Sequence, residues 1–266
     1  MSRVRTVLIC LPIACVASLA LARIHPFGDA GLYTAKPVNT SILNNSQIPS
    51  EVRTILVEKC ADCHSTQTRV PIYGRFAPTS WLMERDIVAA REAMNLSLWD
   101  RYSAEQQQTF AAKIAQETKA HEMPLLQYRM VHWNARVNDA EIRTLANWAR
   151  AASGPEVGQE MPLAGEGDPV RGKVLFEKRC TGCHALSQNH QGPRLQGVYG
   201  RTSGTVPDYA YSTALRKAKI AWDKTSLDKW LTDPDAFLPG NNMDFLVSRP
   251  QERQDIISYL RQTSGR

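Results

Sequence analysis

Two copies of the pattern Cys-x-x-Cys-His are the feature that most restricts how this chain can fold. They stand at residues 60–64 (CADCH) and 180–184 (CTGCH), and they hold four of the six cysteines in the 266-residue sequence. The other two, Cys10 and Cys15, lie in an apolar N-terminal run. Side chains three and four positions apart share one face of a helical turn, so each copy presents two thiols and one imidazole together. The sequence therefore predicts two compact sites of the same chemistry, 180 − 60 = 120 positions apart.

Cysteines with this spacing can bond to the two vinyl groups of one haem, and the histidine that follows them can bind the iron. Cys-x-x-Cys-His is the attachment signature of c-type haem. A zinc site commonly needs two more Cys or His ligands nearby, and the sequence has no further cysteine outside its first 23 residues. A thioredoxin-like redox pair requires a βαβ context, for which the pattern is missing. We therefore expect two covalently attached haem c groups, one held by Cys60, Cys63 and the iron ligand His64, the other by Cys180, Cys183 and the iron ligand His184.

The N-terminus has the pattern of an export signal. Arg3 and Arg5 precede an apolar run over residues 7–22 that ends in Ala-Leu-Ala, which favours a cleaved signal peptide over residues 1–23. The alternative is an uncleaved anchor, because the run approaches the roughly 17 residues that a membrane span needs. An anchor would tether the protein through residues 6–22. Both alternatives predict a periplasmic location, soluble or held at the inner membrane facing the periplasm.

Polar segments divide the rest of the chain into two domains of similar size. Residues 24–48 are polar and lack sustained periodicity, which predicts a spacer. Residues 153–167 are rich in Gly, Pro and Glu and predict a linker. The predicted domains therefore cover residues 49–152 and 168–266.

Helix start signals recur in both domains. Ser50, Ser103 and the pair Asn138 and Glu141 can cap helices in the first domain, and Asp168 followed by a proline can do so in the second. No run of alternating β-branched residues competes with them. The fold class we expect is all-α, with two small helical domains, each wrapped around one covalent haem.

Beside CTGCH, the second domain carries Gly172 and Phe176 in its first predicted helix, Tyr259 in its last and the segment PGNNM at residues 239–243. With these residues it resembles class I cytochrome c of the mitochondrial and bacterial type over residues 166–264. Gly172 and Phe176 match the positions that pack the first helix of that family against the last helix, here through Tyr259, and PGNNM matches the loop that delivers the distal methionine. The resemblance implies that Met243 is the second protein ligand of this haem iron.

The same resemblance implies further haem-binding residues. Pro193 matches the proline whose carbonyl orients the proximal histidine, and three residues match contacts of the haem propionates: Arg201, Tyr211 and Trp222. The family often carries Thr and Lys before the distal methionine, whereas this chain has Asn241 and Asn242. We expect this difference to change hydrogen bonding near the sulfur, and with it the haem potential, without preventing ligation.

The first domain has a different set of motifs: CADCHST, a Pro-x-Tyr element at 71–73, an Ala-Pro-x-Ser-Trp helix start at 77–81, Met-Asn-x-Ser-x-Trp at 94–99 and a late Met-Pro at 123–124. With these motifs it resembles the small bacterial haem-binding cytochrome domain over residues 54–150. These motifs predict haem binding, and they say less about mechanism than those of the second domain.

The distal ligand of the first haem has three candidates near one another in the sequence. Met123 is favoured, because Pro124 ends the preceding helix and fixes the exit of the chain. His121, which we place on the apolar stripe of that helix, and His132, in a loop before a tryptophan, are the alternatives. Met130 and Met94 are interpreted as core gap fillers, Met94 also as a haem contact.

The functional prediction is an exported dihaem cytochrome that passes single electrons between periplasmic or membrane redox partners. These partners would be a dehydrogenase, an oxidase or a reductase, and the haem iron would change oxidation state while the protein fixes the ligands. The alternative is a dihaem peroxidase-like enzyme with an open or opening haem in the first domain; the carrier is favoured over an enzyme. The net charge is +6, but no basic run with interleaved aromatic residues suggests nucleic-acid binding.

Overall fold

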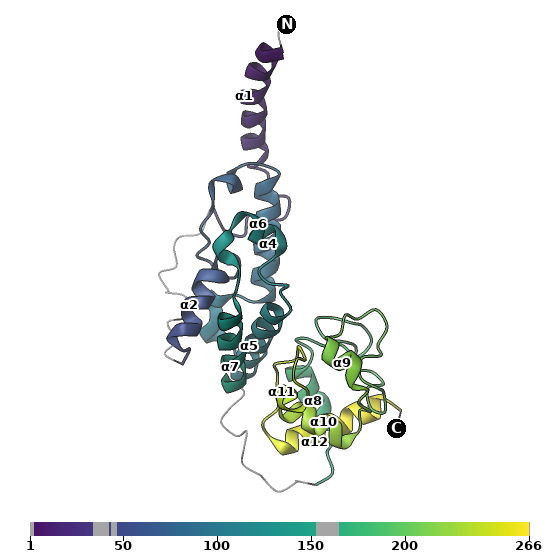
Figure 1. Cartoon of the computed structure of the whole chain (residues 1–266). Coiled ribbons are helices and arrows are strands. Elements are labelled where there is room, and N and C mark those ends of the chain that lie inside the picture. The colour runs from purple at the N-terminus through teal and green to yellow at the C-terminus, as the bar shows by residue number, and fades with distance from the viewer. Residues whose placement is uncertain (1–2, 34–42, 44–46, 153–164, 266) are drawn as a thin grey trace. The chain divides into compact units, whose positions relative to one another are not determined.

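Every regular element in the described part of the computed structural model is a helix (Figure 1). The structure describes residues 3–33, 43, 47–152 and 165–265. Among them, β-type pairing is limited to one isolated bridge between Thr202 and Ala221. The prediction of an all-α fold is confirmed.

The chain forms two compact units, Met1–Arg101 and Tyr102–Arg266. This division falls inside the segment 49–152 that the sequence predicts as one domain. Most of the predicted linker, residues 153–164, lies outside the described residues. The domain boundaries proposed from the sequence therefore stay a prediction.

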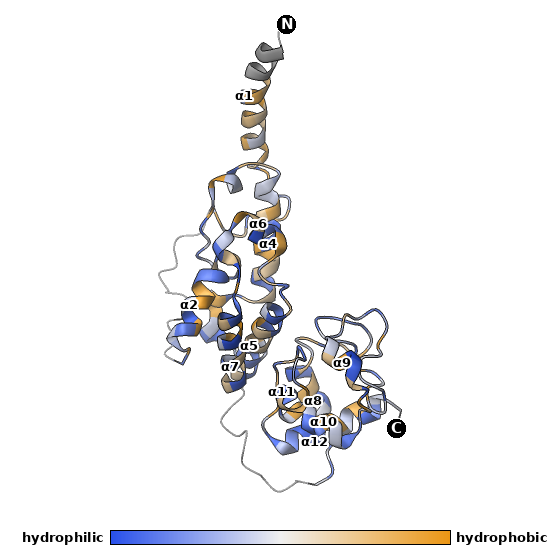
Figure 2. Cartoon of the chain, viewed as in Figure 1, coloured by the Kyte–Doolittle hydropathy of each residue, from blue (hydrophilic) through white to orange (hydrophobic). Residues whose placement is uncertain are grey.

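The first unit begins with the long helix α1 (Arg3–Leu21), which takes up most of the predicted export signal. Figure 2 shows the later turns of α1 largely in the hydrophobic colour, and the side chains of Leu11, Ile13 and Val16 are exposed. None of the helices in the described part of the chain combines the length and apolar character required to cross a bilayer.

The remaining elements of the first unit surround the first Cys-x-x-Cys-His motif. They are α2 (Ser50–Lys59), α3 (Ala61–His64), η1 (Ile72–Arg75), α4 (Thr79–Ala93) and η2 (Leu96–Arg101). Their core contains Leu56 from α2, Ile87 from α4 and two residues of η2, Leu96 and Trp99, all of them buried. Ser50 is the first residue of α2 and makes no capping hydrogen bond, so the cap predicted there is wrong.

The start of the predicted spacer is attached to α4. The indole N–H of Trp81 donates to the Ile24 carbonyl at 2.7 Å. His25 Nδ1 lies 3.0 Å from Glu84 Oε1, and the Tyr33 hydroxyl donates to the same oxygen at 3.1 Å. Glu84 itself is fully buried. Residues 24–33 therefore pack on the first unit, while residues 34–42 and 44–46 lie outside the described part of the chain.

The second unit contains two groups of helices. The first group is α5 (Ala104–Lys119), α6 (Leu126–Val131), η3 (Trp133–Ala135) and α7 (Asp139–Ala152). The second is α8 (Pro169–Arg179), α9 (Thr213–Ala218), α10 (Lys224–Thr232), α11 (Pro234–Phe237) and α12 (Pro250–Thr263).

Three predicted helix starts are confirmed by hydrogen bonds. Ser103 and Gln106 form a reciprocal capping box at the start of α5. Asn138 Oδ1 accepts from the backbone N–H of Glu141 at 3.0 Å, and Glu141 Oε2 accepts from that of Asn138 at 2.8 Å. Asp168 accepts from the backbone of Val170 at 2.8 Å at the start of α8. These caps satisfy N–H groups that the helices leave without an internal partner.

The end of α5 differs from the sequence prediction. The helix stops at Lys119, and His121 is exposed with a backbone φ of 58°, in the left-handed region. A helix cannot comfortably run into Pro124, so the chain leaves the helical path before it. His121 therefore does not extend the apolar stripe of α5, and that prediction is wrong.

Close packing of α8 on α12 organises the C-terminal group. A Cβ atom added to Gly172 would lie 1.9 Å from the carbonyl oxygen of Asp255, so only glycine permits this approach. One turn later, the rings of Phe176 and Tyr259 lie 5.4 Å apart. The contact predicted between the first and last helices of this group is confirmed.

Candidate haem-binding sites

The second Cys-x-x-Cys-His motif forms one tight turn directly after α8. The backbone N–H groups of Cys183 and His184 both donate to the Cys180 carbonyl, at 3.1 and 2.8 Å. These bonds have the i+3 and i+4 spacing of a helical turn, which brings side chains with that spacing to one face. The turn therefore presents two sulfur atoms and one imidazole together.

The ring of His184 is fixed for binding a metal through its outer nitrogen. Its Nδ1 lies 2.8 Å from the Pro193 carbonyl oxygen, and because a carbonyl only accepts, Nδ1 carries the proton. Burial lowers the pKa of His184, which favours the neutral ring with an Nε2 lone pair. A Cβ on Gly192 would lie 2.2 Å from His184 Cε1, so this position must be glycine. The predicted role of Pro193 in orienting the ring agrees with this hydrogen bond.

The predicted distal ligand Met243 is held by two bonds of different kinds. The indole N–H of Trp230 donates to the Met243 sulfur at 3.0 Å. Asn241, fully buried, accepts from the Met243 backbone N–H at 2.6 Å and donates to the Leu238 carbonyl at 3.0 Å. Asn241 thus fixes the loop through its backbone, whereas the donor to the sulfur is Trp230, which the sequence analysis missed.

The three predicted propionate contacts lie in the same unit. Arg201 donates to the carbonyls of Gln196 and Arg194 at 3.1 and 3.0 Å, in the loop that follows Pro193. Trp222 is buried with its ring 5.3 Å from that of Trp230. Burial raises the pKa of Tyr211 above its ordinary value, and the nearby charge of Arg201 offsets part of this rise. Contact of these residues with haem propionates stays a prediction.

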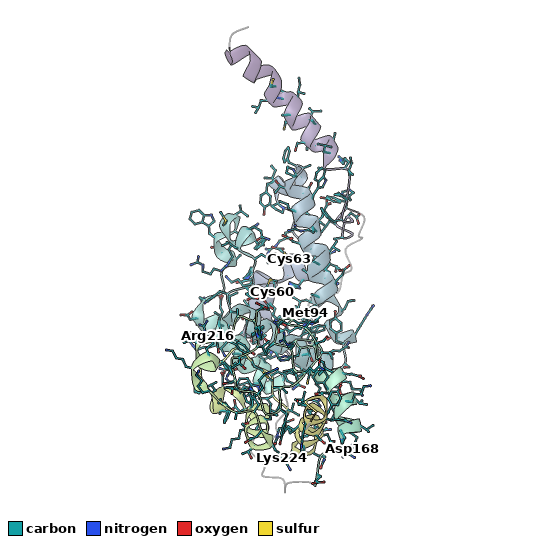
Figure 3. The ribbon with its side chains drawn as sticks, turned by 90° about the vertical axis from the view of Figure 1, so that its right-hand side faces the viewer. Cys60, Cys63, Met94, Asp168, Arg216 and Lys224 are labelled. Atoms are coloured by element: carbon teal, nitrogen blue, oxygen red, sulfur yellow. The ribbon has the colours of Figure 1, made fainter. Side chains whose placement is uncertain are left out.

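The first Cys-x-x-Cys-His motif forms the same turn in the first unit. Cys60 ends α2, and its carbonyl accepts from the backbone N–H groups of Cys63 and His64 at 3.3 and 3.0 Å. His64 Nδ1 lies 3.1 Å from the carbonyl oxygen of Met94, the buried residue that ends α4. Figure 3 labels Cys60, Cys63 and Met94 in one region of the first unit. Burial lowers the pKa of His64.

Both proximal histidines are therefore held through Nδ1 by a backbone carbonyl. The acceptor Pro193 was predicted from a family resemblance, whereas Met94 was predicted only as a gap filler or haem contact. The acceptor in the first unit lies 30 positions after His64 in the sequence. Any residue type can supply a carbonyl, so the side chain of Met94 gave no signal for this role.

Three of the four motif thiols have environments that disfavour free thiolate chemistry. Burial raises the pKa of Cys63 to about 11, that of Cys180 to about 12 and that of Cys183 to about 11. A thiol with such a pKa is protonated near neutral pH, whereas metal binding and disulfide exchange use the thiolate. Thioether-bonded cysteines carry no such charge, so the donor set and its surroundings fit a covalent haem.

The candidates for the distal ligand of the first haem all lie in the second unit. His121 is exposed, Met123 is half-buried, and His132 stacks on Tyr128 with ring centroids 4.1 Å apart. Met130 is 71% exposed, so its interpretation as a core residue is wrong. Met123 as the ligand stays a prediction, with His121 and His132 as its alternatives.

Comparison with known proteins agrees with these two sites. Residues 24–151 match the model of a haem-binding domain family, and residues 169–264 match the cytochrome c family model. Cytochrome c of Euglena viridis is 49% identical over 98 residues, which cover 36% of this chain and 96% of that protein. The chain belongs to the cytochrome c family. Its C-terminal part is a class I cytochrome c domain, fused to an N-terminal haem-binding domain, and the protein is a haem-containing electron carrier.

Other cytochromes show similar coverage. Cytochrome c of Chlamydomonas reinhardtii is 39% identical over 103 residues, 37% of this chain and 92% of its own length. Among solved structures, cytochrome cH from Methylobacterium extorquens is 40% identical, covering 36% of this chain and 99% of that one, with a TM-score of 0.35.

The haem-binding domain family model extends to residue 24, so it includes residues 24–33 that pack on α4.

Proposed function

We propose that this cytochrome c carries two covalently bound haems and passes single electrons between partners in the periplasm. The observation that carries the proposal is the repeated proximal arrangement. In each unit a Cys-x-x-Cys-His turn ends in a histidine whose Nδ1 is bound to a backbone carbonyl, that of Met94 or Pro193. A second unit with the same donor geometry supports a second haem.

The residues have separate tasks in this proposal. The cysteines would attach the haems, the histidine rings would offer Nε2 to the iron, and Met243 would supply a thioether sulfur as the other protein ligand of the second haem. Bound haem iron accepts and releases one electron, and a His/Met ligand pair generally raises its potential. The hydrogen bonds to His184 and Met243 keep both ligands in place when the charge of the iron changes.

The number of haems can be measured with paired variants. Purified protein should contain two haems per chain by the absorbance of the pyridine derivative. Replacing Cys60 and Cys63 with serine should lower the count to one, and replacing Cys180 and Cys183 should also lower it to one, with different residual spectra. A count of one in the unaltered protein, lost only in the Cys180 and Cys183 variant, would refute the dihaem proposal.

The proposed location and partners rest on the N-terminal pattern. Arg3, Arg5 and the apolar residues 7–22 support export, by a cleaved signal or by an anchor through residues 6–22. A periplasmic dehydrogenase, oxidase or reductase would then exchange electrons with the haems. Cell fractionation and the mass of the purified chain test this: haem-loaded protein found only in the cytoplasm would contradict it.

A further inference from the structure

The half-buried side chain of Arg91, in the last turn of α4, joins three segments of the first unit. Its Nε donates to the Ser65 carbonyl at 2.8 Å, and Nη2 donates to the Thr68 hydroxyl at 2.9 Å. Its Nη1 donates to the Ala30 carbonyl. One guanidinium therefore binds the end of the haem motif, the loop after it and the segment 24–33.

Two of these contacts bear directly on the proximal histidine. Ser65 follows His64 in the chain and is fully buried. The Thr68 hydroxyl that accepts from Arg91 donates in turn to the carbonyl of Asp62, inside the motif, at 2.6 Å. Arg91 thus restrains the backbone on both sides of His64.

The acceptor of the histidine lies on the same short stretch of chain. His64 Nδ1 is bound to the carbonyl of Met94, three residues after Arg91. The stretch is tied to the motif a second time, because the Ser97 hydroxyl oxygen accepts from the backbone N–H of Thr66 at 3.0 Å. Arg91 therefore holds together the histidine and the helix end that orients it.

The class I domain has a comparable arrangement built from different residues. There Arg201 donates to the carbonyls of Arg194 and Gln196, which follow the acceptor Pro193. In both units a guanidinium binds backbone carbonyls next to one partner of the histidine hydrogen bond. A guanidinium has five N–H donors in a rigid fork, and a lysine ammonium cannot reach the same acceptors with the same geometry.

We propose that Arg91 is a positioning residue for the proximal ligand of the first haem. It acts through its bond to the Ser65 carbonyl and through the helix end that carries Met94, and it sets the orientation of the His64 ring. Its positive charge, held against the Ser65 carbonyl next to His64, also favours the reduced haem. This inference rests on the proposal that Cys60 and Cys63 carry a haem.

The test compares Arg91→Gln, Arg91→Lys and Arg85→Gln in the full-length, haem-loaded protein. Arg85 is the matched control, because it lies on the same helix but is 49% exposed and pairs with its neighbour Asp86 at 2.8 Å. Haem content is measured first, then the ferric electron paramagnetic resonance spectrum and the midpoint potential of each haem. The second haem serves as the internal reference in every sample.

Arg91→Gln should lower the potential of the first haem and shift its g values. Arg91→Lys keeps the charge, so its potential should change less, but its g values should shift because the fork is lost. Arg85→Gln and the second haem should be unchanged. If Arg91→Lys carries two haems per chain and its g values are unaltered, the positioning role alone is overturned. If the unaltered protein carries a single haem, the dihaem proposal is overturned and this inference with it.

If the Arg91 variants fail to incorporate the first haem, Thr68→Val provides a milder test of the same role. Thr68→Val removes one acceptor of Arg91 and keeps the size of the side chain. We expect a smaller shift of the first-haem g values in the same direction as in Arg91→Lys. If Arg91 variants lose the first haem and Thr68→Val has the spectrum of the unaltered protein, the positioning role is rejected.

Discussion

At the scale of single residues, the two haem sites are defined by what holds each ligand in place. His184 depends on the Pro193 carbonyl and on the absence of a side chain at Gly192. Met243 depends on Asn241 for its backbone and on Trp230 for its sulfur. In the haem-loaded protein such hydrogen bonds would change how strongly each ligand donates to the iron, which is one of the ways a protein adjusts a haem potential.

Trp230→Phe tests the bond to the sulfur. Phenylalanine keeps most of the buried aromatic surface but has no N–H, so the Met243 sulfur loses its donor and becomes a stronger electron donor to the iron. The midpoint potential of the second haem should fall, and the near-infrared sulfur-to-iron band should shift. The cost in stability should be about 1 kcal/mol, as for a typical hydrogen bond.

The control for this prediction is Trp148→Phe, which replaces another buried tryptophan in α7 of the same unit. Its second-haem potential and sulfur band should match those of the unaltered protein. Equal potentials in Trp230→Phe and Trp148→Phe would show that the indole N–H does not act on the ligand.

The residues that the sequence predicted correctly are those whose partners are close in the chain or whose chemistry is unique. The two Cys-x-x-Cys-His turns and the cap at Ser103 need only residues within four positions. The roles of Met94 and Arg91 were missed. Met94 bonds to His64, 30 positions away, and Arg91 bonds to the Ser65 carbonyl, 26 positions away. Every residue has a backbone carbonyl, so the sequence does not indicate which carbonyl is used. Trp230 was not named as a site residue, because its partner Met243 lies 13 positions later, in a loop whose position the sequence pattern does not give.

At the scale of elements, the contact between α8 and α12 is the best-defined packing in the class I domain. Gly172 allows the α8 backbone to approach Asp255 on α12, and Phe176 packs on Tyr259. Ile256, Ile257 and Leu260 complete the buried face of α12. The contact between these helices was predicted from the family resemblance. The end of α5 at Lys119 was not predicted, because the left-handed backbone at His121 is not visible in the spacing of apolar residues.

Gly172→Ala should destabilise this helix pair. The added methyl group would overlap the Asp255 carbonyl at 1.9 Å, so the helices must separate or shift. Overpacking of this kind typically costs about 1–3 kcal/mol, measurable as a lower midpoint of denaturant unfolding. Gly165→Ala is the matched control, since a Cβ there meets no atom within 4 Å, and it should unfold as the unaltered protein does. Similar losses in both variants would contradict the packing argument.

At the scale of the whole molecule, the function depends on whether both irons have two protein ligands. Met243, the predicted ligand of the second proposed haem, lies in a fixed loop within the unit that carries Cys180 and Cys183. The motif that would attach the first haem lies in the unit Met1–Arg101, while Met123, His121 and His132 belong to the unit Tyr102–Arg266. An iron that lacks its second protein ligand would be open to small molecules, whereas a fully ligated iron would not.

Carbon monoxide binding to the reduced protein distinguishes these cases. An electron carrier with two fully ligated irons should not form a carbonyl complex rapidly at either haem. Met123→Ala should open the first haem, so that about one haem per chain binds carbon monoxide quickly and the low-spin signal of that haem changes. His121→Ala and His132→Ala should behave as the unaltered protein does, because neither side chain then binds the iron. Rapid binding of carbon monoxide by the unaltered protein would instead support the peroxidase-like alternative. Rapid binding only in a histidine variant would show that this histidine, and not Met123, is the distal ligand.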